Sequence, residues 1–132
     1  MDKVKGTVQS NVGFYIGDIC YILSDENYFK FWGEKHHYQD GVFKVPRTGF
    51  SFAVSATAHG DGFYEDNEGG EYPVDGGNIG LVPLELISKY HNESLGKVVK
   101  EPGRASFSEE GGVFTITLPK GRVVRIDTSE DW

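Results

Sequence analysis

Glycine constrains this chain more than any other residue type. It occupies 18 of 132 positions, about twice the usual share of roughly 7%. The glycines are scattered, without the three-residue period of a collagen. Because glycine readily adopts the backbone angles of tight turns, this distribution predicts many turns and therefore many short strands. With 38% hydrophobic and 25% charged residues, the chain is expected to form one domain over residues 1–132, with 129–132 as a frayed tail.

The hydrophobic pattern predicts a mainly β, α+β domain of about eight short, mostly antiparallel strands and two short helices. Residues 13–23 are almost uninterruptedly apolar, which is typical of a central strand buried on both faces, and Gly17 and Asp18 mark a bend within it. Helices are expected over residues 24–33 and 84–90, where Ser24 and Pro83 suit the first turn. A curled sheet, a partly closed barrel and a small sandwich all fit this pattern. The other expected strands cover residues 3–9, 42–45, 49–57, 78–82, 96–100, 105–109, 113–118 and 122–128.

Aromatic residues are concentrated in the first predicted helix. Tyr28, Phe29, Phe31 and Trp32 lie at helical spacing, a pattern typical of a helix face that packs on the core. The alternative is a surface on which a ligand or a partner stacks. Residues 36–41, which follow this helix, are predicted to form a turn.

Charge and termini bear on partners and compartment. The chain has 13 Lys and Arg residues against 20 Asp and Glu, a net charge of −7. Such a balance lacks the positive field that binds nucleic-acid phosphates and disfavours docking on anionic membranes, so neither partner is expected. The single cysteine, Cys20, excludes an internal disulfide framework and suits a reducing compartment. With no secretory signal and no apolar run long enough for a membrane span, a cytoplasmic location is expected.

The segment 57–80 differs from the rest, with 7 glycines and 6 carboxylates in 24 positions. One interpretation is a hairpin in which 63–65 and 71–75 are strands, 66–70 is the turn and the carboxylates are solvated. The other is a binding loop, where glycines let a ligand approach the backbone and polar side chains flank it. The candidate binding residues are Asp18, His59, Asp61, Tyr64, Tyr72 and Asp75.

Three of these residues also make a candidate metal site. Asp18, Asp61 and Asp75 would form a cluster if the ends of their strands met, and carboxylate oxygens could then hold Ca²⁺ or another divalent cation. The spacing does not match an EF-hand loop, and no other cofactor is expected. The same carboxylates could serve a metal-assisted hydrolase. Cys20 is expected to pack as a small hydrophobic residue, and no standard nucleophile, phosphate-loop or zinc-protease motif occurs, so no catalytic residue is assigned.

Three short motifs follow one another along the chain. They are Tyr-x-Gly-Asp at residues 15–18, Gly-Asp-Gly-x-Tyr at 60–64 and Tyr-x-Val-Asp-x-Gly-x-Ile-Gly at 72–80. Over residues 14–82 the chain resembles small proteins of phages and bacterial genomes that carry these motifs in the same order. The resemblance implies a cytoplasmic phage or bacterial accessory protein, and it implies no particular activity.

The leading functional hypothesis is a non-enzymatic domain that binds a protein or a small molecule through residues 57–80. The acidic surface suits a basic partner or mimicry of nucleic acid. One alternative is a carboxylate-dependent hydrolase. A further alternative is a structural or assembly protein, for which a homo-oligomer is an open possibility.

Overall fold

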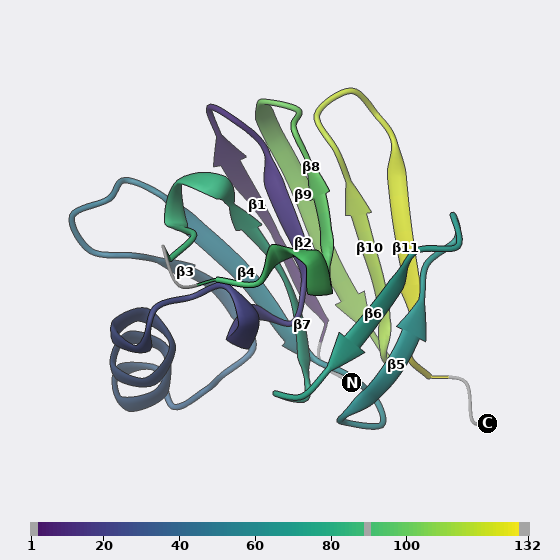
Figure 1. Cartoon of the computed structure of the whole chain (residues 1–132), viewed down its shortest axis with the longest axis horizontal. Helices are drawn as coiled ribbons and strands as arrows, with labels where there is room; N and C mark the ends of the chain where they lie inside the picture. The colour runs from purple at the N-terminus through teal and green to yellow at the C-terminus, as the bar shows by residue number, and fades with distance from the viewer. Residues whose placement is uncertain (1–2, 89–90, 130–132) are drawn as a thin grey trace.

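The structure is a computed structural model that describes residues 3–88 and 91–129. Its strands form three antiparallel sheets (Figure 1). The four-stranded sheet has the order β1-β9-β10-β11, and the five-stranded sheet has the order β3-β4-β7-β2-β8. The third sheet is the hairpin β5–β6. The strand bounds are β1 Val4–Ser10, β2 Phe14–Gly17, β3 Gly41–Lys44, β4 Ser51–Ala56, β5 Gly62–Glu65, β6 Glu71–Val74, β7 Asn78–Pro83, β8 Lys97–Val99, β9 Gly103–Glu110, β10 Val113–Thr117 and β11 Val123–Asp127.

The two larger sheets share one apolar core. Strict alternation along β9 and β10 sends Phe107, Phe114 and Ile116 inward, where they meet residues such as Phe14 and Leu81 from the five-stranded sheet. The hairpin β5–β6 adds its own aromatic and aliphatic side chains to this core. Of the three architectures that the sequence allows, the open arrangement of two facing sheets is the one formed, and the described strands do not close into a barrel.

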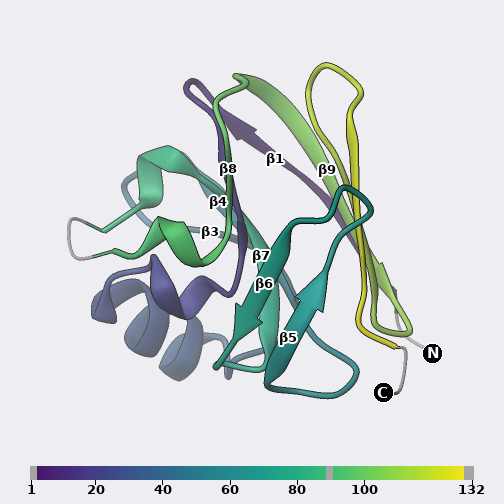
Figure 2. The same cartoon turned by 45° about the vertical axis from the view of Figure 1, so that its right-hand side comes forward.

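The helix η2 (Glu26–Lys35) makes a third layer. It lies on the outer face of the five-stranded sheet, away from the four-stranded sheet (Figure 2). Its buried residues Phe31 and Trp32 pack in a second core with Tyr15, Phe52 and Val82. The central strands β2 and β7 are therefore buried on both faces, which explains why β2 has no charged residues. The aromatic stripe is thus a core face in part, as expected.

The sequence-based element boundaries are correct for most strands and wrong in two places. The apolar segment 13–23 is not one strand: β2 ends at Gly17, and Asp18 caps the single helical turn η1 (Ile19–Tyr21) by accepting a hydrogen bond from the Cys20 N–H. The helix expected over residues 84–90 is only the turn η3 (Leu84–Leu86), because Ile87 is extended and the Ser88 N–H donates to the Ile22 carbonyl instead.

The structure also contains the turn η4 (Glu93–Leu95), which the pattern did not predict. Residues 89–90 of the second expected helix and 130–132 of the expected tail lie outside the described residues. Within the described part of the chain, no helix has the length and apolar character needed to cross a membrane.

The hairpin β5–β6 is attached to the four-stranded sheet by its turn. The Asn67 N–H donates to the Arg125 carbonyl at 3.0 Å, and the Arg125 N–H donates to Oδ1 of Asn67 at 2.8 Å. The Asn67 amide also donates to the Val123 carbonyl at 3.0 Å. One side chain therefore satisfies backbone groups along β11, and the chain places the tip of the hairpin beside that strand.

Candidate functional site

The segment 57–80 forms the hairpin that its pattern suggested. β5 and β6 pair antiparallel from Gly62 opposite Val74 to Glu65 opposite Glu71, so residues 66–70 make the turn, as predicted. The expectation that all its carboxylates are solvated is wrong. The Asp66 residue is only 8% exposed and is enclosed by hydrogen-bond donors.

Asp18 is a buried carboxylate whose oxygens are occupied by backbone donors. Its Oδ1 accepts from the Cys20 N–H at 2.9 Å, and its Oδ2 accepts from the N–H groups of Asp75 and Gly76 at 2.8 and 2.6 Å. Asn78 reinforces the same turn, because its amide donates to the Gly76 carbonyl at 3.0 Å. Asp18 therefore fixes the β6–β7 turn and does not face a ligand.

The other two aspartates of the predicted metal site are exposed. Oδ2 of Asp75 accepts the Tyr21 hydroxyl at 2.6 Å, and burial together with this carboxylate raises the pKa of Tyr21. Asp61 lies beside the turn, near Gly77. Among residues 3–88 and 91–129, no group of three His, Cys, Asp or Glu side chains is arranged to hold a metal ion, so Asp18, Asp61 and Asp75 do not make the cluster that the sequence suggested.

The remaining three candidate residues contact other parts of the chain. Nε2 of His59 lies 3.2 Å from the Ser129 carbonyl. Tyr64 is buried, and its hydroxyl donates to the Gly60 carbonyl at 2.8 Å. Tyr72 is fully buried, and its hydroxyl donates to Oδ2 of Asp66 at 2.6 Å. Tyr64 and Tyr72 therefore hold the hairpin together rather than forming a binding surface.

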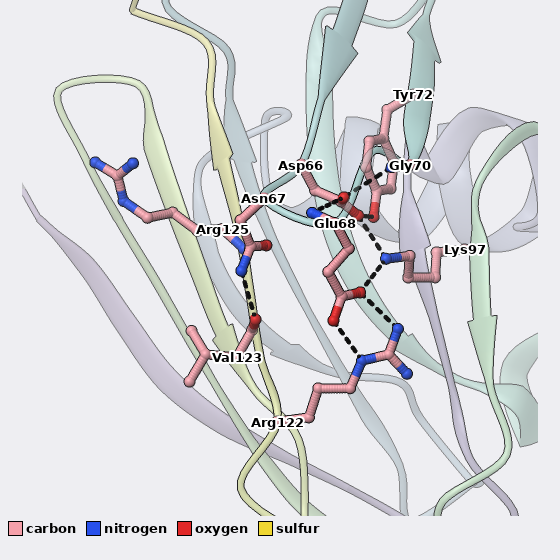
Figure 3. Close-up of polar contacts among 9 residues, drawn as sticks. All are labelled: Asp66, Asn67, Glu68, Gly70, Tyr72, Lys97, Arg122, Val123 and Arg125. Atoms are coloured by element: carbon pink, nitrogen blue, oxygen red, sulfur yellow. Dashed lines mark hydrogen bonds and ion pairs between the residues drawn. The ribbon is translucent and has the colours of Figure 1, made fainter.

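Asp66 belongs to an ion network that joins the hairpin turn to β8 and to the β10–β11 turn (Figure 3). The Lys97 ammonium lies 2.5 Å from Oδ2 of Asp66 and 2.6 Å from Oε1 of Glu68. Arg122 makes a two-pronged contact with Glu68, at 2.8 Å from Nε and 2.5 Å from Nη2. Two backbone N–H groups of the turn also donate to Asp66. Every carboxylate in this network is paired, which is the arrangement of a structural anchor.

The network shifts the pKa of both acids downward. Burial alone would raise the pKa of Asp66, but the Lys97 ammonium, the Tyr72 hydroxyl and the backbone donors lower it to about 2. Hydrogen bonds from Arg122 and Lys97 lower the pKa of Glu68 to about 2. Both groups are therefore ionised in the folded chain at pH values where an unfolded chain begins to take up protons.

These shifts predict acid sensitivity with a definite sign. The folded pKa values lie below the ordinary ones, so the stabilisation is complete above about pH 5 and is lost as the pH falls towards about 2. We expect urea unfolding at a series of pH values to show this decrease in the free energy of unfolding. The variant Glu68→Gln should lose less free energy of unfolding as the pH falls. Glu65→Gln changes an exposed residue of the same hairpin and should keep the wild-type dependence on pH. Equal slopes for all three proteins would contradict the assignment.

A groove of about 370 Å³ opens between η2 and the β6–β7 turn, and its largely aromatic lining makes it a candidate ligand site. One wall is aromatic and comes from η2 and the loop after it. Another part of the lining is glycine backbone from the turn that Asp18 holds in place. The lining residues are Tyr28, Phe29, Trp32, Tyr38, Asp40, Ala56, Gly76, Gly77 and Asn78.

The aromatic rings of the groove stand at steep angles to one another. Trp32 and Tyr38 are nearly perpendicular, at 89°, with ring centroids 5.2 Å apart. Tyr28 is inclined by 70° to Trp32 and by 74° to Phe29, with centroid distances of 5.3 and 4.9 Å. Phe29 and Tyr38 remain 53% and 50% exposed. The rings therefore form the walls of a recess and not a flat platform.

Tyr38 reaches its place through an unusual backbone conformation. Its φ is +53°, and that of His37 is +57°, a region that non-glycine residues seldom occupy. The ring packs directly over Gly33, where an added Cβ would lie only 2.5 Å from Cζ of Tyr38. The Trp32 indole N–H donates to the Gln39 carbonyl at 2.8 Å and fixes the loop that carries Tyr38. The strained backbone is thus held in place by packing and by a hydrogen bond.

The groove is electrically negative. Asp40 is exposed at its rim, and Oδ1 of Asp40 accepts the Ala56 N–H at 3.0 Å. Asp18 lies directly behind Gly76, since a Cβ added there would lie 3.0 Å from Oδ1 of Asp18. Burial raises the pKa of Tyr28 to about 12. Electrostatic interactions with Cys20 and Asp18 add to this shift, and a hydrogen bond with Asn78 opposes it.

The groove combines features that the sequence analysis treated separately. Gly76 and Gly77 belong to the glycine-rich segment, and Tyr28, Phe29 and Trp32 belong to the aromatic stripe, for which a stacking surface was the alternative interpretation. Tyr38 and Asp40 were missed, because residues 36–41 were interpreted only as a turn. The sequence did contain one signal: Gly33 lies between the aromatic stripe and Tyr38, and a glycine at such a place lets a ring pack closely against the backbone.

Comparison with known proteins gives no further guide to the use of this groove. The chain matches no protein-family model, no curated protein and no solved structure.

Proposed function

We propose that this protein is a non-enzymatic binding domain and that its ligand occupies the aromatic groove. The observation that carries the proposal is the groove itself, which is lined both by the exposed rings of Phe29 and Tyr38 and by the backbone of Gly76 and Gly77. Partly exposed rings beside an accessible backbone are a common feature of small-molecule sites, which are mostly apolar with a few placed polar groups.

The rigidity of the groove supports the same proposal. Asp18 and Asn78 fix the turn from behind, and Gly33 and Trp32 fix the loop of Tyr38 in a strained conformation. Strain of this kind persists where the surrounding structure holds it, and it is common at ligand sites. A preformed site also loses less conformational entropy when the ligand binds. The carboxylates proposed for a hydrolase are not part of the groove lining, so binding is the better-supported function.

Trp32 allows a direct test. The chain has two tryptophans, and Trp132→Phe leaves Trp32 as the only one. We expect its fluorescence to change on titration with members of a panel of small aromatic, sugar and ammonium compounds, because the indole lines the groove. Phe29→Ala should weaken the affinity by about tenfold through loss of one ring contact.

The matched control is Phe63→Ala, which removes an exposed ring on β5, outside the groove. It should leave the titration unchanged. A panel without any response, or a response that Phe29→Ala leaves intact, would count against the groove as the site.

A further inference from the structure

The chemistry of the groove selects among ligands. None of its lining residues is basic, and one of them, Asp40, carries a negative charge. The lysines of η2 are engaged elsewhere: Lys30 pairs with Glu26 at 3.7 Å, and Lys35 lies over the Phe31 ring at 5.9 Å. An anionic ligand would therefore meet a carboxylate without a compensating positive charge in the lining.

Two donors of the turn are bonded within the chain. The Gly76 N–H donates to Asp18, and the Asn78 amide donates to the Gly76 carbonyl. Asp40 retains capacity as an acceptor, since Oδ1 holds the Ala56 N–H and Oδ2 has no hydrogen bond or ion pair from the described residues. The groove thus presents ring faces and a carboxylate oxygen, a combination that attracts a cation.

The arrangement of the rings narrows the kind of cation. A primary ammonium is strongly hydrated and needs acceptors for its three N–H groups, and Asp40 is the one carboxylate among the residues that line the groove. A quaternary ammonium has no N–H group, and its methyl groups pack against aromatic faces while its charge is attracted to the rings and to Asp40. Tyr38 is inclined by 53° to Tyr28 and by 89° to Trp32, so these rings do not offer the parallel faces between which a planar ligand would stack. The volume of about 370 Å³ is at the lower end of small-molecule sites, which favours a small ligand over a peptide.

We infer that the groove between Tyr28, Tyr38 and Asp40 binds a small quaternary ammonium compound. This inference rests on the proposed function and specifies the ligand class of the same site. Tyr28, Trp32 and Tyr38 provide the inclined ring walls, Phe29 covers the rim, and Asp40 supplies the opposite charge.

The test compares choline with 3,3-dimethylbutan-1-ol, a neutral compound of the same shape in which carbon replaces nitrogen. In the Trp132→Phe protein, Trp32 fluorescence should report choline binding with about tenfold or higher affinity than for the neutral compound. Asp40→Asn keeps an acceptor for the Ala56 N–H and removes only the charge. It should weaken choline binding by about threefold to tenfold and leave binding of the neutral compound unchanged. Glu65→Gln, an exposed charge on β5, should change neither affinity.

The possible outcomes test the ligand class and the location of the site independently. Equal affinity for choline and its neutral counterpart, or choline binding unaffected by Asp40→Asn, would overturn the inference. If other compounds of the panel bind in a Phe29-dependent manner and choline does not, the ligand class fails and the groove stands. If a trimethyllysine peptide binds and choline does not, the assignment to a small molecule is wrong. If nothing binds, both proposals fail.

Discussion

Replacing Asp18 by alanine is expected to lower the free energy of unfolding by about 3–5 kcal/mol, because a hydrogen bond to a charged group contributes about 1.5–3 kcal/mol and Asp18 accepts three of them. Three backbone N–H groups, those of Cys20, Asp75 and Gly76, would lose the acceptor that the buried Asp18 carboxylate provides. For a domain of this size, such a loss corresponds to a decrease in Tm on the order of 10 °C. Urea and thermal unfolding of the purified variant measure it.

The conservative variant distinguishes the charge from the hydrogen bonds. Asp18→Asn keeps one acceptor oxygen, so we expect a loss of about 2 kcal/mol. Asp61→Asn is the matched control, because Asp61 is exposed and its change should stay within about 0.5 kcal/mol. Asp18→Asn should also weaken binding in the groove, since the β6–β7 turn forms one wall. A loss below about 1 kcal/mol for Asp18→Ala would show that water or the turn itself replaces the missing acceptor.

The second large effect is expected at the hairpin anchor. Asp66→Ala removes the acceptor for the Tyr72 hydroxyl, two backbone N–H groups and the Lys97 ammonium, so we expect a loss of about 3–5 kcal/mol. Lys97→Met removes only the cation and leaves Asp66 with its other three donors. Its cost should be smaller, about 1–3 kcal/mol.

A double-mutant cycle tests whether the two groups act as a pair. Once Asp66 is absent, Glu68 is the remaining ion-pair partner of Lys97 among the described residues, so Lys97→Met should cost much less in the Asp66→Ala background. We expect an interaction free energy of at least about 1 kcal/mol from urea unfolding of the four proteins. Additive changes would mean that the hydrogen bonds to Asp66, and not the ion pair, hold the hairpin.

The features that could be predicted from the sequence are those that depend on short local patterns, such as turns and the strands next to them. Two glycines, Gly111 and Gly112, separate alternating residues before and after them, and β9 and β10 pair around that turn as expected. The hairpin β5–β6 also followed from its turn residues. Such features depend on neighbouring residues, so a single sequence contains them.

The errors arise where tertiary contacts decide. Pro83 and the residues after it favour a helix locally, but a backbone hydrogen bond from Ser88 to Ile22 draws that segment into an extended path. Asp66 was predicted to be solvated because its partner Lys97 lies far along the chain. The groove was not predicted as one site, because Tyr38 and Gly76 meet only after η2 packs on the five-stranded sheet.

The position of Asn67 has a consequence for contacts between molecules. β11 is the last strand of the four-stranded sheet, and the outward backbone groups of such a strand can pair with a strand of another chain. Here the N–H and carbonyl of Arg125 and the carbonyl of Val123 are already bonded to Asn67 of the same chain. Growth of this sheet by addition of a second copy at β11 would first require the hairpin turn to move away, so the fold protects this edge against aggregation through strand pairing.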